Sequence, residues 1–344
     1  MRPKLYKHLF KSLIWRNGPD GLFDGDLFWM EGAKDMEGFG ASFAFKYIRN
    51  LGTILPQNGG HLIHPFDTVL AFVALDTADI LDLGGHVSIE IGEERETYIF
   101  NQSQIINIPK GVQYGNLKVT EFKHDFALFA IYLAPEYSAG YIPSSDLSEP
   151  VKGSNLYSEN IRIYAWSVDD EGQPIHKVTP FRDDEKGKVA FKQRTDSRGI
   201  MHSADSAGPG GMGPGNADSL LWKFGDDMLG FELNTFWTHC SHCGKWHRAG
   251  EQHTHPAEEI LLVFSLDADD PLNLGAEMEE SMGPEDERYA ANVPSVWICP
   301  KDFEHLPQIT RWVDRPFAFC AISLDSSHVS NWIDEHGNRV NTRA

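Results

Sequence analysis

The chain has 344 residues, of which 41% are hydrophobic and 12% aromatic, which is enough for one large buried core or two ordinary ones. Asp and Glu total 50 against 30 Lys and Arg, so the formal charge is −20. This acidity argues against nucleic acid or an anionic membrane as a partner, because both attract clustered positive charge.

Most of the chain predicts short strands. A helix is expected only near residues 4–14 and after residue 326. Between them lie compact apolar or β-branched runs, each bounded by Gly, Asp, Asn or Pro: SQIINIPKG (103–111), FALFAIYL (126–133), EEILLVFSLD (258–267) and FAFCAISL (317–324). Runs of this length and spacing favour an antiparallel sandwich or barrel.

The sequence repeats itself at a spacing of 191 residues. His64-Pro65 matches His255-Pro256, and residues 64–133 align with 255–324 without a gap. About 21 of these 70 pairs are identical, against roughly 4 expected from composition. With two single-residue gaps the match extends upstream, so that the copies cover about 27–133 and 220–324. A repeat of this size is a whole domain, which indicates a tandem duplication.

This organisation predicts an N-terminal barrel over 1–133, a connecting segment over 134–219 and a C-terminal barrel over 220–344. The connecting segment contains two strand-like runs, NIRIYAWSV (160–168) and KVAFKQR (188–194). It ends in SADSAGPGGMGPGNADS (203–219), which is too rich in Gly, Pro and Ser to pack regularly and is expected to be a loop.

The second copy contains a group of metal-binding residue types. His253 and His255 are two apart, so they face the same side of a strand, and Glu259 follows on that side. His305 comes 46 residues later, at the start of another expected strand. Three imidazoles and a carboxylate suit a borderline divalent ion such as Fe, Mn, Co, Ni, Cu or Zn.

HxHxxxE followed by PxxxxH resembles the two-part metal motif of the cupins, and a duplicated chain of this kind resembles the bicupins. The resemblance implies two tandem jelly-roll β-barrels, an all-β fold with few short helices. It also implies one divalent transition metal inside the C-terminal barrel, held by His253, His255, Glu259 and His305, with iron expected first. The chain departs from the second motif at Asp302 and Ile309, where the family usually has Gly and Asn, and these positions affect the turn more than ligation.

The first copy lacks most of this set. His64 corresponds to His255, but Leu62, Thr68 and Tyr114 stand at the other three positions. A single imidazole holds a transition metal weakly, so we expect no metal in the N-terminal barrel, which could still contain a pocket of its own.

Other polar groups have several interpretations. The cluster Cys240, His242 and Cys243 could be structural, line the pocket, or form a second metal or redox site. His247 and Trp246 lie on the approach to the ligand strand, and His247 is the candidate catalytic residue. The acidic run Glu277–Glu287 is expected to be a solvated loop.

A metal with open coordination positions favours an enzyme acting on a small molecule. The main hypothesis is an oxidoreductase of the dioxygenase or oxidase type, acting on a small organic acid or carbonyl compound. One alternative is a Lewis-acid isomerase, lyase or decarboxylase for a sugar acid or keto acid, and another is a non-catalytic binding protein. The sequence contains no apolar stretch long enough to span a membrane, no signal-peptide segment and only four cysteines. These features indicate a reducing, cytoplasmic location without a membrane partner. A homodimer is left open.

Overall fold

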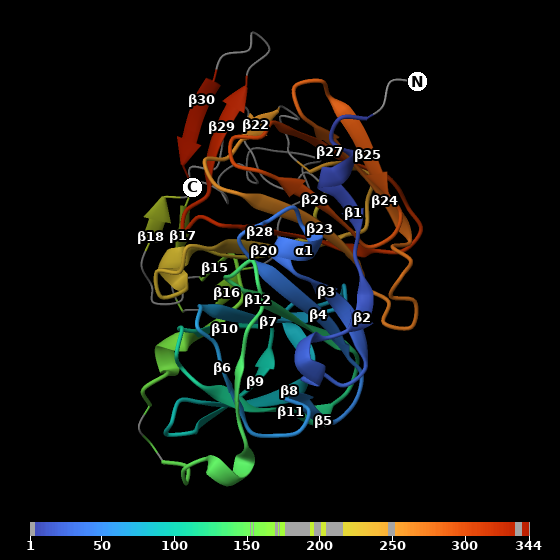
Figure 1. Ribbon diagram of the computed structural model, residues 1–344. Helices are drawn as coiled ribbons and strands as arrows, with labels where there is room; N and C mark the ends of the chain where they lie inside the picture. The colour runs from blue at the N-terminus through green and yellow to red at the C-terminus, as the bar shows by residue number, and fades with distance from the viewer. Residues whose placement is uncertain are drawn as a thin grey trace. The chain divides into compact units, whose positions relative to one another are not determined.

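The structure, a computed structural model, describes residues 4–151, 153, 155–168, 171, 173–175, 193–195, 201–203, 216–246, 252–333 and 339–343. The chain divides into two compact units (Figure 1). The N-terminal unit is Leu13–Tyr164, and the C-terminal unit is Met1–Ser12 together with Ala165–Ala344.

The N-terminal unit consists of two antiparallel sheets. The first has the order β14-β10-β7-β12-β4-β3-β2, and the second has the order β13-β6-β11-β8-β9 with β5 beside β11. The strands of the first sheet are β2 (Trp15–Asn17), β3 (Asp26–Met30), β4 (Ser42–Ile48), β7 (Thr68–Ala74), β10 (Gln104–Ile108), β12 (Phe126–Tyr132) and β14 (Ile161–Ile163). Those of the second sheet are β5 (Gly52–Leu55), β6 (His61–Ile63), β8 (Asp82–Ile91), β9 (Glu96–Gln102), β11 (Tyr114–Phe122) and β13 (Gly140–Ile142).

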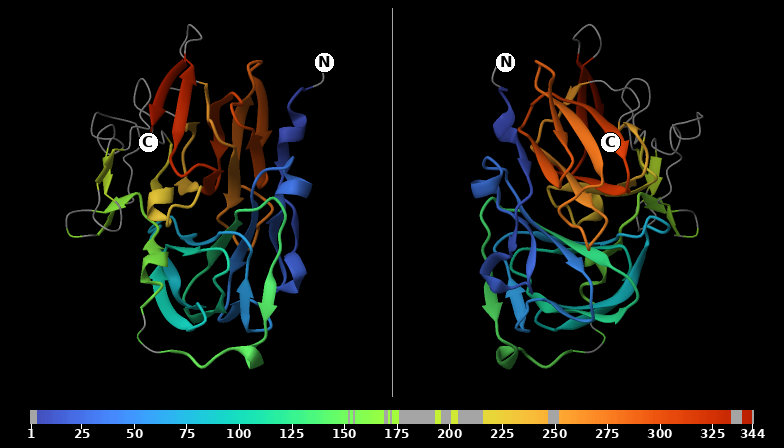
Figure 2. Two further views of the ribbon diagram at one scale, coloured as in Figure 1. Left: turned by 60° about the vertical axis from the view of Figure 1, so that its left-hand side comes forward. Right: turned by 90° about the vertical axis from the view of Figure 1, so that its right-hand side faces the viewer.

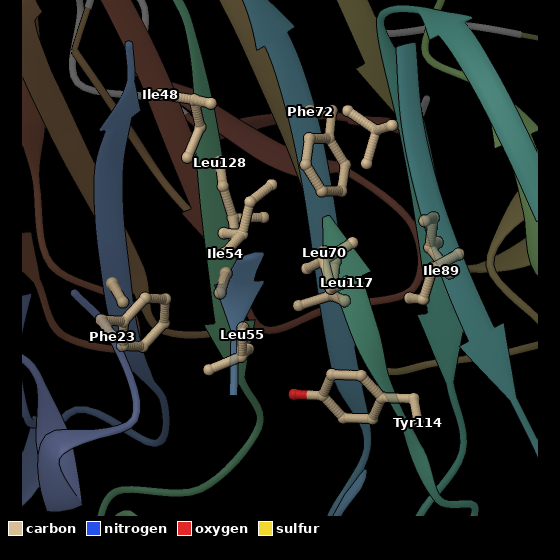
Figure 3. Close-up of a cluster of buried hydrophobic side chains, with 14 of the residues drawn as sticks. Phe23, Ile48, Ile54, Leu55, Leu70, Phe72, Ile89, Tyr114, Leu117 and Leu128 are labelled. Atoms are coloured by element: carbon tan, nitrogen blue, oxygen red, sulfur yellow. The ribbon is translucent and has the colours of Figure 1, made fainter. Parts of the chain in front are cut away.

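Apolar side chains from both sheets form the core of this unit, as Figure 3 shows. β7 and β12 are buried at every position, which agrees with the unbroken apolar runs read from the sequence. Phe72 and Leu128 extend from these strands toward Leu117 and Ile89 of the other sheet. This interior is where the motif positions of the first copy lie.

The C-terminal unit repeats the arrangement, and Figure 2 shows its orange and red strands in two further orientations. Its sheets have the orders β1-β26-β23-β28-β20-β19 and β25-β24-β27-β22-β29-β30, with β21 beside β27. The strands of the first sheet are β1 (Phe10–Ser12), β19 (Ser219–Lys223), β20 (Asn234–Cys240), β23 (Glu259–Ser265), β26 (Ser295–Cys299) and β28 (Phe317–Ser323). Those of the second are β21 (Gly244–Lys245), β22 (His253–Thr254), β24 (Ala276–Met282), β25 (Glu287–Ala291), β27 (His305–Val313), β29 (Val329–Ile333) and β30 (Arg339–Arg343).

The 191-residue repeat reappears in the strands. β7, β10, β11 and β12 each coincide with β23, β26, β27 and β28 when their bounds are shifted by 191. The expected fold of two tandem jelly-roll barrels is therefore confirmed. The boundaries at residues 133 and 219 stay a prediction, and residues 204–215 of the expected Gly/Pro-rich loop lie outside the described residues.

Both helix expectations are wrong. Residues 7–9 form one 3-10 turn, η1 (Lys7–Leu9), and β1 follows it and pairs with β26 of the C-terminal unit. Residues after 326 form β29 and β30. Long-range pairing with an available sheet edge overrides the local pattern in both segments. The described α-helix is the four-residue α1 (Gly32–Asp35), and no helix among the described residues is long and apolar enough to cross a membrane.

The segment before β1, which we call the first arm (residues 4–12), is fixed by a set of hydrogen bonds to a hairpin. The amide of Leu5 donates to Glu287 Oε2 at 2.8 Å, and the amide of Tyr6 donates to Tyr289 Oη at 3.0 Å. Gly283, at φ +74°, leaves room for the Tyr6 ring, because a Cβ there would come within 2.1 Å of it.

The N-terminal unit has a matching segment, the second arm (residues 155–163). The amide of Leu156 donates to Glu96 Oε1 at 2.8 Å, and the amide of Tyr157 donates to Tyr98 Oη at 3.1 Å. β14 of this arm then pairs with β10, the counterpart of β26. Each unit thus has the same docking site for a Leu-Tyr arm. The first arm precedes the N-terminal unit in the sequence but belongs to the C-terminal one.

We expect Leu9→Ala to lower the free energy of unfolding of the C-terminal unit by about 2–4 kcal/mol, because this side chain is 5% exposed. Urea unfolding, with hydrogen exchange in peptides from β26, measures the loss. Leu5→Ala is the control, since Leu5 is 56% exposed and should change the value by less than about 0.5 kcal/mol. Equal values for the two variants would contradict the packed position of the first arm.

Candidate metal centre

The motif residues of the second copy lie at the ends of strands from both sheets of the C-terminal unit. His253 in β22 and His305 in β27 are paired directly across neighbouring strands. Glu259 opens β23 in the other sheet, and His255 lies between β22 and β23. Strand alternation turns His253 and His255 to one side, and the passage of the chain from one sheet to the other brings Glu259 to meet them.

The donor atoms of the four motif residues lie close together in this interior, linked by short contacts. The Nε2 atoms of His253 and His255 lie 2.8 Å apart. Glu259 Oε2 lies 3.2 Å from Nε2 of His255 and 3.4 Å from Nε2 of His305. The residues are His253, His255, Glu259 and His305, each exposed by 3% or less, and Glu259 joins the three imidazoles through His255 and His305.

Backbone carbonyl groups orient two of the imidazoles. The Nδ1 atom of His255 lies 2.7 Å from the carbonyl oxygen of Val329, and that of His305 lies 3.1 Å from the carbonyl oxygen of Phe303. A carbonyl accepts only, so each Nδ1 carries the hydrogen and each Nε2 presents its lone pair to the common point. Metal-bound histidines are oriented in this way by their outer partners.

Charge within the group favours an ionised carboxylate. Burial alone would raise the pKa of Glu259, but the neighbouring His255 outweighs it and holds that pKa well below its usual value. Burial lowers the pKa of His255, and the Glu259 carboxylate reverses this to a net increase. The Glu259 carboxylate and the His255 imidazole therefore stabilise each other's charged forms, and a divalent cation would compete with the proton on the imidazole.

This donor set fits a divalent metal. The ligand atoms of His253, His255 and His305 lie within 4.8 Å of one another, and so do those of His255, Glu259 and His328. The mixture of nitrogen and oxygen donors suits the borderline ions of the first transition series. Among the described residues, groups of three or more such donors occur only here.

His328 belongs to the second of these groups and was missed by the sequence analysis. It directly precedes β29, is 6% exposed, and its ring centroid lies 4.6 Å from that of His255. Burial, followed by the charge on His255, lowers the pKa of His328 to about 3. Its position bears no spacing relation to the motif, and the first copy has Tyr137 there, so the repeat does not mark it.

Glu280 was also missed, because the acidic run was expected to be a solvated loop. That expectation is wrong for Ala276–Met282, which form β24, and Glu280 is 0% exposed. Its Oε1 accepts a hydrogen bond from the amide of Leu306 at 2.9 Å, next to His305. Burial, partly offset by this bond, raises the pKa of Glu280 well above its usual value.

The remaining candidate residues have different outcomes in the structure. His247 lies outside the described residues, so its catalytic role stays a prediction. Trp246 is buried and stacks on Phe236, with ring centroids 5.0 Å apart, which is a core position. Cys240 is buried in β20 and Cys243 is exposed, and neither belongs to a group of three donors among the described residues.

Tyrosines occupy the corresponding interior of the first copy. His64 Nε2 lies 3.1 Å from Tyr114 Oη, and its Nδ1 lies 2.9 Å from the carbonyl oxygen of Ser138. Tyr132 and Tyr137 surround the same imidazole, with ring centroids 5.3 and 5.5 Å away. Phenol groups therefore stand close to where the second copy has ligands.

No family model and no curated protein sequence matches the chain. Solved structures do match it. Oxalate decarboxylase from Bacillus subtilis at pH 4.6 aligns over 97% of this chain and 78% of its own, with 8% identity and a TM-score of 0.51. Another structure of oxalate decarboxylase, from work on its substrate binding mode, aligns over 94% and 79%, with 9% identity and a TM-score of 0.50. These matches span both repeat units. The chain has the bicupin fold.

At 8–9% identity the likeness concerns the fold alone. A further match, with a TM-score of 0.50 and 9% identity, has a title that names the Mn(II) centres of Bacillus subtilis oxalate decarboxylase. In the chain described here, the donor group lies in the C-terminal repeat, where the HxHxxxE motif indicated it.

The N-terminal barrel should lose stability in acid through His64. Burial lowers the pKa of this imidazole, which outweighs its hydrogen bond to Ser138. The unfolded chain therefore binds the proton more readily, so the stability contribution is complete above about pH 6.5 and falls as the pH drops below it.

We expect His64→Gln to reduce the pH slope of unfolding free energy between pH 6.5 and 5, by up to about 1.4 kcal/mol per pH unit. The slope is measured by urea unfolding at each pH, with hydrogen exchange in peptides from β6 and β7 as the readout. The same slope in both proteins would show that His64 does not contribute.

Proposed function

We propose that this bicupin is a divalent-metal-dependent enzyme acting on a small carboxylic acid, with His253, His255, Glu259 and His305 as the metal ligands. The observation that carries the proposal is the convergence of four donor atoms, each from a residue at most 3% exposed. A fully buried carboxylate beside three imidazoles is costly as a purely structural feature. It is typical of a site that receives a cation.

Four protein donors leave positions open on a five- or six-coordinate ion, whereas structural metal sites tend to be closed. A bound divalent cation would supply Lewis-acid stabilisation of a carboxylate and of the charge that develops when a carbon–carbon bond breaks. The chain supplies the surroundings. Trp332 packs against His253 with ring centroids 4.3 Å apart, and Leu306 is buried beside it. These apolar groups exclude water and strengthen electrostatic interactions.

Decarboxylation is the reaction class that we favour. The solved structures compared above are titled oxalate decarboxylase, and one title names Mn(II). This supports the non-redox decarboxylase hypothesis over the dioxygenase or oxidase one, and manganese over iron. Both choices are proposals for this chain.

We expect His253→Ala and Glu259→Ala to remove most bound metal while leaving the barrel folded. The first copy packs its barrel with Leu62 and Thr68 at these positions, so the ligands are dispensable for folding. Metal analysis after loading with Mn²⁺, with circular dichroism for the fold, measures both effects. Glu258→Ala is the matched control, a carboxylate one residue away that is only half-buried. Unchanged metal content in both variants would refute the ligand assignment.

The reaction class is tested with Mn²⁺-loaded protein and a panel of small mono- and dicarboxylic acids that includes oxalate and 2-keto acids. We expect CO₂ release without net O₂ consumption. CO₂ trapping measures the release, and an oxygen electrode measures the consumption. Metal-free protein is the control. Oxygen consumed in proportion to substrate would instead support an oxidoreductase, and no turnover of the panel with metal bound would contradict the decarboxylase proposal.

A further inference from the structure

The chain crosses between the two sheets of the C-terminal unit directly above the donor group. β28 ends at Ser323, which is paired with Glu259 of β23. β29 begins at Val329 and lies beside β22, where Asn331 is paired with Thr254. The residues between, 324–328, therefore run from the carboxylate side of the site to the imidazole side, and His328 is the last of them.

Hydrogen bonds hold this crossover at both ends. The amide of Leu324 donates to the carbonyl oxygen of Glu258 at 2.9 Å, and the amide of Gly225 donates to that of Ser326 at 2.8 Å. The carbonyl oxygen of Val329, next to His328, accepts the bond from His255 Nδ1. The backbone that carries His328 is thus tied to one ligand directly and to another through its neighbour.

The ring of His328 is confined to the site. Trp222 packs against it edge-on, with ring centroids 5.2 Å apart, and His255 lies on it with centroids 4.6 Å apart. The Nδ1 atom of His328 is buried and has no hydrogen-bond partner among the described residues. One of its ring nitrogens lies within 4.8 Å of the donor atoms of both His255 and Glu259. A buried imidazole nitrogen without a partner is costly unless something binds it.

The first copy shows that this position faces the barrel interior in both units. Tyr137, the residue 191 positions earlier, follows β12 and precedes β13, as His328 follows β28 and precedes β29. Its ring lies 5.5 Å from that of His64, and its buried hydroxyl also has no partner among the described residues. The fold therefore aims this side chain at the site, and only the second copy has a ligand residue type there.

We propose that His328 is a fifth protein donor to the metal, added to the cupin-type set of three histidines and one glutamate. The inference rests on the proposed function, because it needs an ion at the four-donor site. Five protein donors leave one position on a six-coordinate ion. A carboxylate substrate would then bind the metal through a single oxygen instead of two.

The test counts the bound histidines with Co²⁺ as the probe. In the proton NMR spectrum of the Co²⁺-loaded protein, each ligated neutral imidazole gives one strongly shifted N–H resonance. We expect four in the parent protein, from His253, His255, His305 and His328. His328→Phe and the more conservative His328→Gln should each show three, with Co²⁺ affinity lowered about 100-fold, at the top of the range for losing an outer partner of a metal ligand.

Tyr137→Phe is the matched control, because it changes the equivalent position of the other copy and should alter neither measurement. Circular dichroism of the metal-free proteins checks the fold, and His328→Gln keeps the test open if the Phe variant fails to fold. Three resonances in the parent protein, or an unchanged number in the variants, would overturn the fifth donor even if affinity fell. A parent protein that binds no Co²⁺ would instead refute the proposed function itself.

Discussion

Burying a carboxylate among imidazoles in a barrel interior constrains everything around it. His255 and His305, within 3.4 Å of its Oε2 atom, lower the pKa of Glu259 and so favour its ionised form. The net charge of the group is balanced by a proton or by a cation, since an unpaired charge in such a place costs several kcal/mol. Metal binding there would exchange a proton for an ion, and the carbonyl groups of Val329 and Phe303 hold two of the imidazoles in position for it.

Sequence reasoning predicted the fold and singled out four residues that the structure brings together, because both follow short-range rules. Alternation along a strand brings His253 and His255 to one side, and the 191-residue repeat marks where each barrel begins. His328 was not predicted, because it reaches the site only through the crossover after β28. That crossover is a feature of the topology and has no local sequence signal. The burial of Glu280 was not predicted, because an acidic run on a strand has the composition of a solvated loop unless the facing strand is known.

The first arm shows the same limit. Residues 4–14 have no local feature that predicts pairing with β26, nearly 300 residues later, so the polar and apolar mixture was taken for a helix. The sequence did contain a clue in Leu5-Tyr6 and Leu156-Tyr157, which are bound by equivalent Glu and Tyr residues of the two units. This similarity lies outside the 191-residue register, so an alignment at one fixed spacing cannot detect it.

The placement of the first arm makes the C-terminal unit depend on a segment that lies at the other end of the sequence. The edge of β26 in the C-terminal unit is covered by a strand encoded ahead of the whole N-terminal barrel. Any truncation from the N-terminus that discards that barrel also removes the edge strand β1 from the C-terminal unit and exposes the unpaired edge of β26, which is a hazard for aggregation.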